Sequence, residues 1–247
     1  METSGLRLIL IRHGETEWAR DGRHTGRTDV PLTELGRLQA TVLGDRLRGR
    51  TFGRVLTSPL ARASETCRLA GVGEDAEISD DLMEWDYGEY EGRRTAEIRQ
   101  EVPGWSIWRD GVPGGESAAE VGARADRVIA DALATDEETV LFAHGHYLRV
   151  LTARWVGLPP ENGRLFALAP ATIGVLGYER EQRVIVRWND RCHLVLPSYV
   201  WEEQGDLDVR PGDPSVGSGD DREKPRPGKA PSPDSQVGTP DQPAPLG

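Results

Sequence analysis

The sequence predicts an α/β fold, a three-layer α/β/α sandwich around a mostly parallel central sheet. Short apolar runs such as residues 6–11 are typical of buried strands, and segments with helical periodicity follow them. Strand-like and helix-like segments then alternate along most of the chain. Parallel strands need long crossover connections, which helices supply. We therefore expect helices on both faces of the sheet.

The strands after residues 6–11 are predicted from clusters of β-branched and apolar residues between turn-forming residues. The last two are separated by a tight polar turn, which should join them as neighbours in the sheet. The predicted strands lie at residues 54–57, 76–79, 139–143, 172–178 and 183–188.

The helices are predicted where capping residues precede apolar residues three or four positions apart. In the first helix this apolar stripe consists of Leu35, Leu38, Val42, Leu43 and Leu47. The second is expected to end near Gly71. The predicted starts are Thr33, Ser58-Pro59, the capping box of Ser117 with Glu120, and Gly145.

The composition excludes several classes of protein. A formal net charge of −11 over 247 residues argues against nucleic acid as the partner, although a small phosphate ester needs only a locally positive pocket. No apolar run approaches the ~20 residues that span a bilayer, and the start of the chain lacks the pattern of a signal peptide. Cys67 and Cys192 are too few for a disulfide framework. We expect a cytoplasmic protein without membrane contact.

A compositional break near residue 203 predicts a domain boundary. From Glu203 onward the chain is rich in Pro, Gly, Asp and Ser, and both lysines, Lys224 and Lys229, fall there. Such a segment cannot bury enough apolar surface to offset the entropy cost of ordering. We predict one folded domain over residues 1–202 and a disordered tail over residues 203–247. The alternative is a tail that binds a partner or regulates the protein.

Polar residues follow three of the predicted strands, where each strand ends. Arg12 and His13 follow the first, Arg62 lies just after the second, and His144 follows a later one. The carboxyl ends of parallel strands share one edge, where such folds bind ligands. A cation in the first turn of a helix, where Arg62 is expected, opposes the helix dipole unless an anion lies between them. The pattern therefore predicts an anion pocket that contains an imidazole nucleophile.

The motifs at these junctions resemble those of the histidine phosphatase superfamily, in its phosphoglycerate-mutase-like branch 1. The resemblance covers about residues 6–190 and looks closest to broad-specificity acid phosphatases and sugar bisphosphatases. The motifs are R-H-G-E at 12–15, T-S-P-L-A-R at 57–62 and A-H-G-H at 143–146.

The resemblance implies a role for each matching residue. His13 is implied to be the nucleophile that becomes phosphorylated, Glu84 the acid and base, and His144 a further catalytic residue in the phosphate pocket. Arg12 and Arg62 are implied to bind the phosphate, together with the loop at Thr25 and Gly26. Since two arginines can neutralise the phosphoryl group, we expect neither a metal nor a cofactor.

Several other candidate site residues have two possible interpretations. Glu15 either binds substrate or anchors its loop, and Asp86 and Glu89 are acidic rivals of Glu84. His146 is expected at the pocket edge rather than in phosphoryl transfer. A set of aromatic residues either walls the substrate entrance or packs in the core: Trp18, Trp85, Tyr87, Trp105 and Trp108.

Two departures from the mutases of the family favour a phosphatase. Ala19 follows Trp18 where many mutases carry Asn, and the connection from Gly92 to Gly114 is short. A short cap excludes water less well, which favours hydrolysis of the phosphoenzyme. We expect a small phosphorylated substrate of the sugar or glycerate type. The alternatives are a cofactor-dependent phosphoglycerate mutase and a non-catalytic module that binds phosphorylated ligands. An edge strand at residues 183–188 would allow a homodimer.

Overall fold

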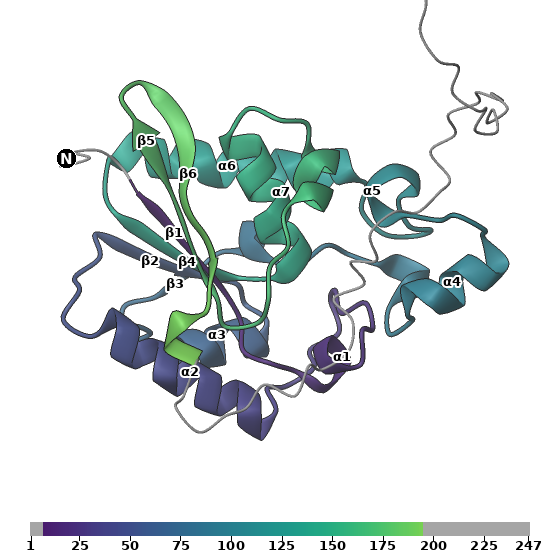
Figure 1. The fold of residues 1–247 in the computed structure, drawn as a ribbon, viewed down its shortest axis with the longest axis horizontal. Helices are drawn as coiled ribbons and strands as arrows, with labels where there is room; N and C mark the ends of the chain where they lie inside the picture. The colour runs from purple at the N-terminus through teal and green to yellow at the C-terminus, as the bar shows by residue number, and fades with distance from the viewer. Residues whose placement is uncertain (1–6, 195–247) are drawn as a thin grey trace, which may run out of the picture. The chain divides into compact units, whose positions relative to one another are not determined.

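The computed structural model describes residues 7–194, drawn in colour in Figure 1. The predicted tail, residues 203–247, lies outside the described residues. Among the helices that are described, none has both the length and the hydropathy needed to cross a bilayer. The strands are β1 (Leu8–Arg12), β2 (Arg54–Thr57), β3 (Glu77–Ile78), β4 (Thr139–Ala143), β5 (Ile173–Glu179) and β6 (Gln182–Asp190). The helices are α1 (Glu17–Arg20), α2 (Glu34–Leu47), α3 (Ala61–Leu69), α4 (Thr95–Glu101), α5 (Ile107–Asp110), α6 (Ala118–Thr135) and α7 (Gly145–Trp155), with 3-10 helices η1 (Asp80–Leu82), η2 (Gly88–Tyr90), η3 (Pro160–Leu165) and η4 (Cys192–Leu194).

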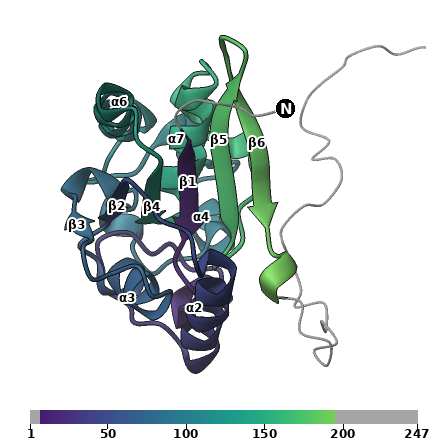
Figure 2. The same cartoon turned by 90° about the vertical axis from the view of Figure 1, so that its left-hand side faces the viewer.

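Within this range the strands form one six-stranded sheet in the order β3-β2-β4-β1-β5-β6 (Figure 2). The four strands β3, β2, β4 and β1 run parallel. The other two are antiparallel: β5 pairs with β1, and β6 with β5. The mostly parallel sheet and the final strand pair are therefore confirmed. β1 lies in the interior of the sheet, between β4 and β5.

Helices cover both faces of the sheet, as Figures 1 and 2 show: α2 and α3 lie on one face, α6 and α7 on the other. The side chains of β1 alternate between two hydrophobic core clusters, since successive residues of a strand point to opposite faces. Leu8 and Leu10 belong to the larger core cluster, whereas Ile9 and Ile11 belong to the smaller one. All four are fully buried, as a strand covered on both faces requires.

Most of the predicted caps are confirmed. The Thr33 side chain accepts a hydrogen bond from the Gly36 N–H at the start of α2, and Ser117 forms the capping box of α6. The cap predicted at Ser58-Pro59 is wrong. The N-cap of α3 is Leu60, which makes no side-chain cap bond, because the strand continues into an extended turn before the helix begins.

The apolar stripe predicted for α2 is partly wrong. Leu35 and Leu38 are 39% and 43% exposed. The buried face of α2 instead consists of Gly36, Ala40, Leu43 and Leu47. Small residues at the start of this face let the helix approach the loop after β1 backbone to backbone, which larger side chains would prevent.

Candidate functional site

The strand ends predicted to carry polar residues do meet at one edge of the sheet. His13 follows β1 and His144 follows β4, and the two ring centroids lie 5.2 Å apart. Ser58 follows β2 and contacts the second ring. The short helices α1, α4 and α5 lie beyond this edge, to the right in Figure 1. The candidate site is thus covered by loops that are far apart in the sequence.

His13 is buried, and its Nε2 has no hydrogen-bond partner among the described residues. Its Nδ1 lies 2.7 Å from the carbonyl oxygen of Gly14. Because a carbonyl can only accept, Nδ1 carries the proton and Nε2 keeps its lone pair. Burial, reinforced by the charges of Arg62 and Arg12, holds the pKa of His13 well below its usual value. The ring is therefore neutral at physiological pH, as a nitrogen nucleophile must be.

His144 is held in the opposite tautomer to His13. The Nε of Arg62 donates to its Nδ1 over 3.2 Å, so the proton sits on Nε2. That nitrogen donates to the hydroxyl of Ser58, 2.8 Å away. Burial and the Arg62 charge keep the pKa of His144 well below its usual range. Both rings are neutral, and their tautomers are fixed by different partners.

Arg62 is fully buried and organises the loop over the pocket. It donates to the carbonyl oxygens of Thr25 at 3.3 Å, Gly26 at 2.8 Å and Thr28 at 2.9 Å. Burial lowers its pKa, although the charge of Glu84 opposes that shift. The guanidinium therefore ties three distant parts of the chain to one point. Its contact with a phosphate stays a prediction.

The backbone carbonyls of Thr25 and Gly26 accept hydrogen bonds from Arg62. The Thr25 hydroxyl donates to the carbonyl of Arg23, and the Gly26 N–H donates to the carboxylate of Glu91. A side chain at Gly26 would not fit, since its Cβ would lie 2.2 Å from a Glu91 oxygen and 2.5 Å from the Trp85 carbonyl. A direct role of this pair in phosphate binding stays a prediction.

Arg12 presents a donor that lacks an acceptor. One of its terminal nitrogens donates to the carbonyl of Leu168. Its Nε is buried and has no hydrogen-bond partner among the described residues. Burial lowers the pKa of Arg12, and the charge of Glu84 partly offsets this. An unpaired buried N–H is costly, and an anionic ligand would satisfy it.

Glu84 lies beside this cluster and is 4% exposed. One of its carboxylate oxygens accepts from the N–H groups of Trp85 at 2.9 Å and Tyr147 at 2.8 Å, and the other accepts from His146 N–H at 3.0 Å. Two of these donors belong to the first turn of α7, where the helix dipole favours a carboxylate. Arg124 fixes the loop that carries Glu84 by donating to the carbonyls of Met83 and Glu84.

The rival acids have other contacts. Asp86 accepts from the N–H of Gly88 and pairs with Arg27 at 3.6 Å, and Glu89 is exposed. Glu15 anchors its loop, because its carboxylate accepts a 2.8 Å hydrogen bond from the Thr33 hydroxyl. Glu84 is therefore the carboxylate among these that is buried at the start of α7 and whose charge acts on both Arg12 and Arg62.

The aromatic residues divide between core and pocket edge. Trp85, Tyr87 and Trp105 are at most 3% exposed, whereas Trp18 and Trp108 are half-buried. His146 makes a 2.5 Å hydrogen bond from its Nδ1 to the Tyr87 hydroxyl, and its ring lies 5.0 Å from that of Trp108. His146 thus lies between Tyr87 and Trp108 and contacts both.

Sequence reasoning missed two supporting residues. Thr66, on α3, accepts from the N–H of Gly14 at 3.0 Å and so holds the loop after β1. Ser58 was assigned to a helix cap although it binds His144. Its position inside the T-S-P motif was the available signal for Ser58, whereas Thr66 had none.

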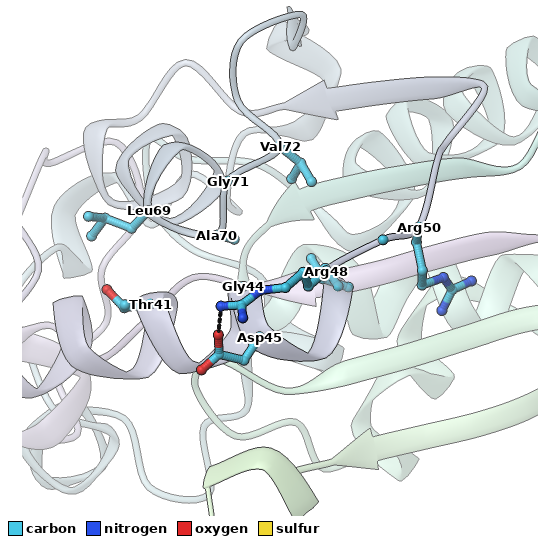
Figure 3. A pocket seen from close by; sticks show the side chains of 11 residues that line it. Thr41, Gly44, Asp45, Arg48, Arg50, Leu69, Ala70, Gly71 and Val72 are labelled. Carbon is cyan, nitrogen blue, oxygen red and sulfur yellow. Dashed lines mark hydrogen bonds and ion pairs between the residues drawn. The ribbon is translucent and has the colours of Figure 1, made fainter.

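A separate pocket of about 390 Å³ lies between the C-terminal ends of α2 and α3 (Figure 3). It is lined by residues that include Thr41, Asp45, Arg48 and Val72, and Asp45 pairs with Arg48 at the end of α2. Because both helices run back along the strands they follow, this pocket lies at the amino end of the sheet. Within residues 7–194 no group of three or more His, Cys, Asp or Glu side chains could hold a metal ion. The expectation of metal-independent chemistry stays a prediction.

Comparisons with known proteins agree with the geometry. The model of the histidine phosphatase superfamily, branch 1, matches residues 8–191. An acid phosphatase of Mycobacterium tuberculosis is 44% identical over 181 residues, which cover 72% of this chain and 89% of the relative. A sedoheptulose 1,7-bisphosphatase of Saccharomyces cerevisiae is 37% identical over 185 residues, 62% of this chain and 68% of the relative. The solved structure of an open reading frame of M. tuberculosis is 42% identical with a TM-score of 0.71, and the match covers 74% of this chain and 96% of that one.

Proposed function

The chain belongs to branch 1 of the histidine phosphatase superfamily, and we propose that it is a phosphomonoesterase that works through a phosphohistidine at His13. Two of its relatives are named as an acid phosphatase and a sedoheptulose 1,7-bisphosphatase. The observation that carries the proposal is the neutral His13 ring, whose Nδ1 is bound to the Gly14 carbonyl, together with the unpaired Nε of Arg12, whose charge acts on that ring. A dianionic phosphoryl group would satisfy that donor and present its phosphorus to the nucleophile.

In the first step, the Nε2 lone pair of His13 attacks phosphorus while the bond to the ester oxygen breaks. The negative charge that spreads over the phosphoryl oxygens is stabilised by Arg12 and Arg62, which need no reorganisation because their other contacts already fix them. The Nδ1–H bond to Gly14 stabilises the positive charge that develops on the ring. His144 holds Arg62 in place through its own bond to Ser58.

Glu84 donates the proton that the first step needs and accepts the proton that the second step releases. Its carboxylic acid gives a proton to the departing alkoxide, which leaves as an alcohol. In the second step the resulting carboxylate takes a proton from water, whose oxygen attacks the phosphorus of phosphohistidine. Inorganic phosphate leaves, and His13 and the protonated Glu84 are regenerated. The three N–H contacts keep the carboxyl group in one orientation through both steps.

The test measures hydrolysis of p-nitrophenyl phosphate and a panel of sugar phosphates and phosphoglycerates by the wild-type protein and by His13→Ala. We expect turnover by the wild type, trapping of an acid-labile phosphoenzyme, and loss of both in the variant. Cys192→Ala, at an exposed position, is the matched control and should keep wild-type rates. Turnover by His13→Ala above a tenth of the wild-type rate would reject the nucleophile. Rapid interconversion of 3- and 2-phosphoglycerate with negligible hydrolysis would replace the phosphatase by a mutase.

The preferred substrate class is a phosphorylated sugar or glycerate. The homodimer expected from the sequence is also a proposal: β6 is an edge strand, paired within the described residues with β5 alone. Light scattering during size-exclusion chromatography measures its mass, and a monomer at micromolar concentration would reject the dimer.

A further inference from the structure

The loop at residues 167–171, which we call the β5 loop because it leads into β5, holds the backbone at the end of β1. Its Ala171 N–H donates to two carbonyl oxygens, that of Arg12 at 3.1 Å and that of His13 at 3.0 Å. The carbonyl of Leu168 in the same loop accepts from the guanidinium of Arg12. The ladder between β1 and β5 has ended before Arg12. The β5 loop therefore fixes the two residues that follow this ladder.

The β5 loop is held in turn by two side chains of β6. The Nε1 of Trp188 donates to the carbonyl of Ala167 at 2.6 Å. The Oδ1 of Asn189 accepts from the N–H of Ala169 at 2.9 Å. Asn189 has a φ of 53°, and the pairing of β5 with β6 shifts register beside it. Such an irregularity redirects a side chain, and here the Asn189 side chain reaches the β5 loop.

His193, in η4, holds the last residue of the β5 loop. Its Nε2 lies 2.9 Å from the carbonyl oxygen of Ala171, and because a carbonyl can only accept, this nitrogen carries the proton. The Nδ1 of His193 is buried and has no hydrogen-bond partner in the described part of the chain. η4 itself packs against α2, as Figures 1 and 2 show. The helix thus supports the turn from which His193 donates.

Ala171 has a backbone conformation that needs such support. Its φ of 52° lies in the left-handed region, which residues with a Cβ rarely adopt unless their surroundings fix it. Its N–H is bound to the carbonyls of Arg12 and His13, and its own carbonyl is bound to His193. Rotation about φ turns these two groups relative to each other. Without the His193 bond, Ala171 could relax and withdraw its N–H from the end of β1.

We propose that Trp188, Asn189 and His193 form a clasp that positions Arg12 and His13 for phosphoryl transfer through the β5 loop. This inference rests on the proposed function and names positioning residues for it in the last elements of the described chain. Each of the three side chains acts on the loop and not on the substrate. Since phosphoryl transfer depends mainly on in-line positioning and fixed charges, a looser β5 loop should slow the reaction.

The kinetic test compares two variants of His193. His193→Leu removes the N–H donor, whereas the side-chain amide of His193→Gln keeps a donor near the same place. With p-nitrophenyl phosphate, His193→Leu should lower kcat about 10-fold and change KM less than about 3-fold, since a small misplacement slows transfer while the contacts of Arg62 do not involve the β5 loop. His193→Gln should recover most of the lost kcat. Asn189→Gly suits the left-handed backbone and should lower kcat in the same way.

Two control variants separate positioning from a general loss of stability. Cys192→Ala changes the residue before His193, whose side chain is exposed, and should keep the wild-type kcat. Val128→Ala removes packing from a buried position of α6, on the face of the sheet opposite α2. It should lower stability in urea unfolding and leave kcat unchanged. The proposal is overturned if His193→Leu keeps the wild-type kcat, if His193→Gln recovers none of the loss, or if Val128→Ala loses as much kcat.

Amide hydrogen exchange tests the clasp without turnover. In His193→Leu the Ala171 N–H should exchange about 10-fold faster than in the wild type, while the Leu141 N–H in β4 keeps its protection. His193→Gln should restore the slow exchange of Ala171. This pattern supports the clasp even if the wild type is inert on every phosphate ester, a result that would reject the proposed function alone. Unchanged exchange at Ala171 overturns the clasp even where His13→Ala has identified the nucleophile.

Discussion

Acid should destabilise the fold through its buried neutral histidines, and His24 allows the effect to be isolated. His24 lies in the loop before Thr25, with its Nε2 3.2 Å from the hydroxyl of Thr95. Its ring stacks at 4.7 Å from Tyr87 and lies 5.5 Å from Trp105. Burial lowers its pKa to about 4. Its surroundings thus favour the uncharged ring.

The sign of the effect follows from that pKa. An unfolded histidine binds a proton below about pH 6.5, whereas folded His24 does so only below about pH 4. Between these values protons favour the unfolded chain, so stability falls as the pH falls. From pH 7 to pH 5 this one group should remove about 2 kcal/mol of the free energy of unfolding. His13, His144 and His146 shift in the same direction and add to the loss.

His24→Phe removes the titrating group and keeps an aromatic ring against Tyr87. It should be less stable than the wild type at pH 7, because Thr95 loses a partner, yet its stability should fall by about 2 kcal/mol less on going to pH 5. Urea unfolding followed by tryptophan fluorescence at both pH values measures this difference. The reasoning is refuted if wild type and variant lose the same stability within about 0.5 kcal/mol, which is the usual scatter of surface changes.

Further predictions concern the acid, the packing and the metal. Glu84→Gln should slow alkyl phosphates far more than p-nitrophenyl phosphate, because a poor leaving group needs the proton; equal slowing in steady-state assays argues against the acid role. Gly36→Ala would place a Cβ 2.1 Å from the Glu15 carbonyl oxygen and should cost about 3 kcal/mol of unfolding free energy, checked by urea unfolding against the exposed Thr41→Ala. Ser58→Ala leaves the Nε2–H of His144 without its acceptor and should cost about 1–3 kcal/mol together with a lower kcat; unchanged stability and kcat would remove Ser58 from the site. Chelators should leave the rate unchanged, and loss of activity that added metal restores would contradict the metal-free mechanism.

The sequence was sufficient for the features that depend on local pattern. The strand at β1, the capping box at Ser117 and the three polar strand ends all follow from neighbouring residues, and the structure has each of them. The family and the enzyme class predicted from the motifs agree with the comparisons. The parallel edge then brings His13 and His144 together, because parallel strands end on the same side.

What the sequence could not supply depends on contacts between distant segments. Whether Ser58 caps a helix or binds His144 depends on the register in which β4 pairs with β2. No local sequence pattern encodes that register. The exposure of Leu35 and Leu38 follows from the close approach of Gly36 to the loop at Glu15.

The position of β1 has a consequence for how the protein is made. Its two partners in the sheet are β4 and β5, which lie at residues 139–143 and 173–179. During synthesis β1 therefore leaves the ribosome before both of its partners, and its two hydrogen-bonding edges stay unpaired until β5 has been made. Such long-range pairing is slow and leaves the nascent chain open to aggregation. Truncation before β5 should then yield insoluble protein rather than a smaller enzyme.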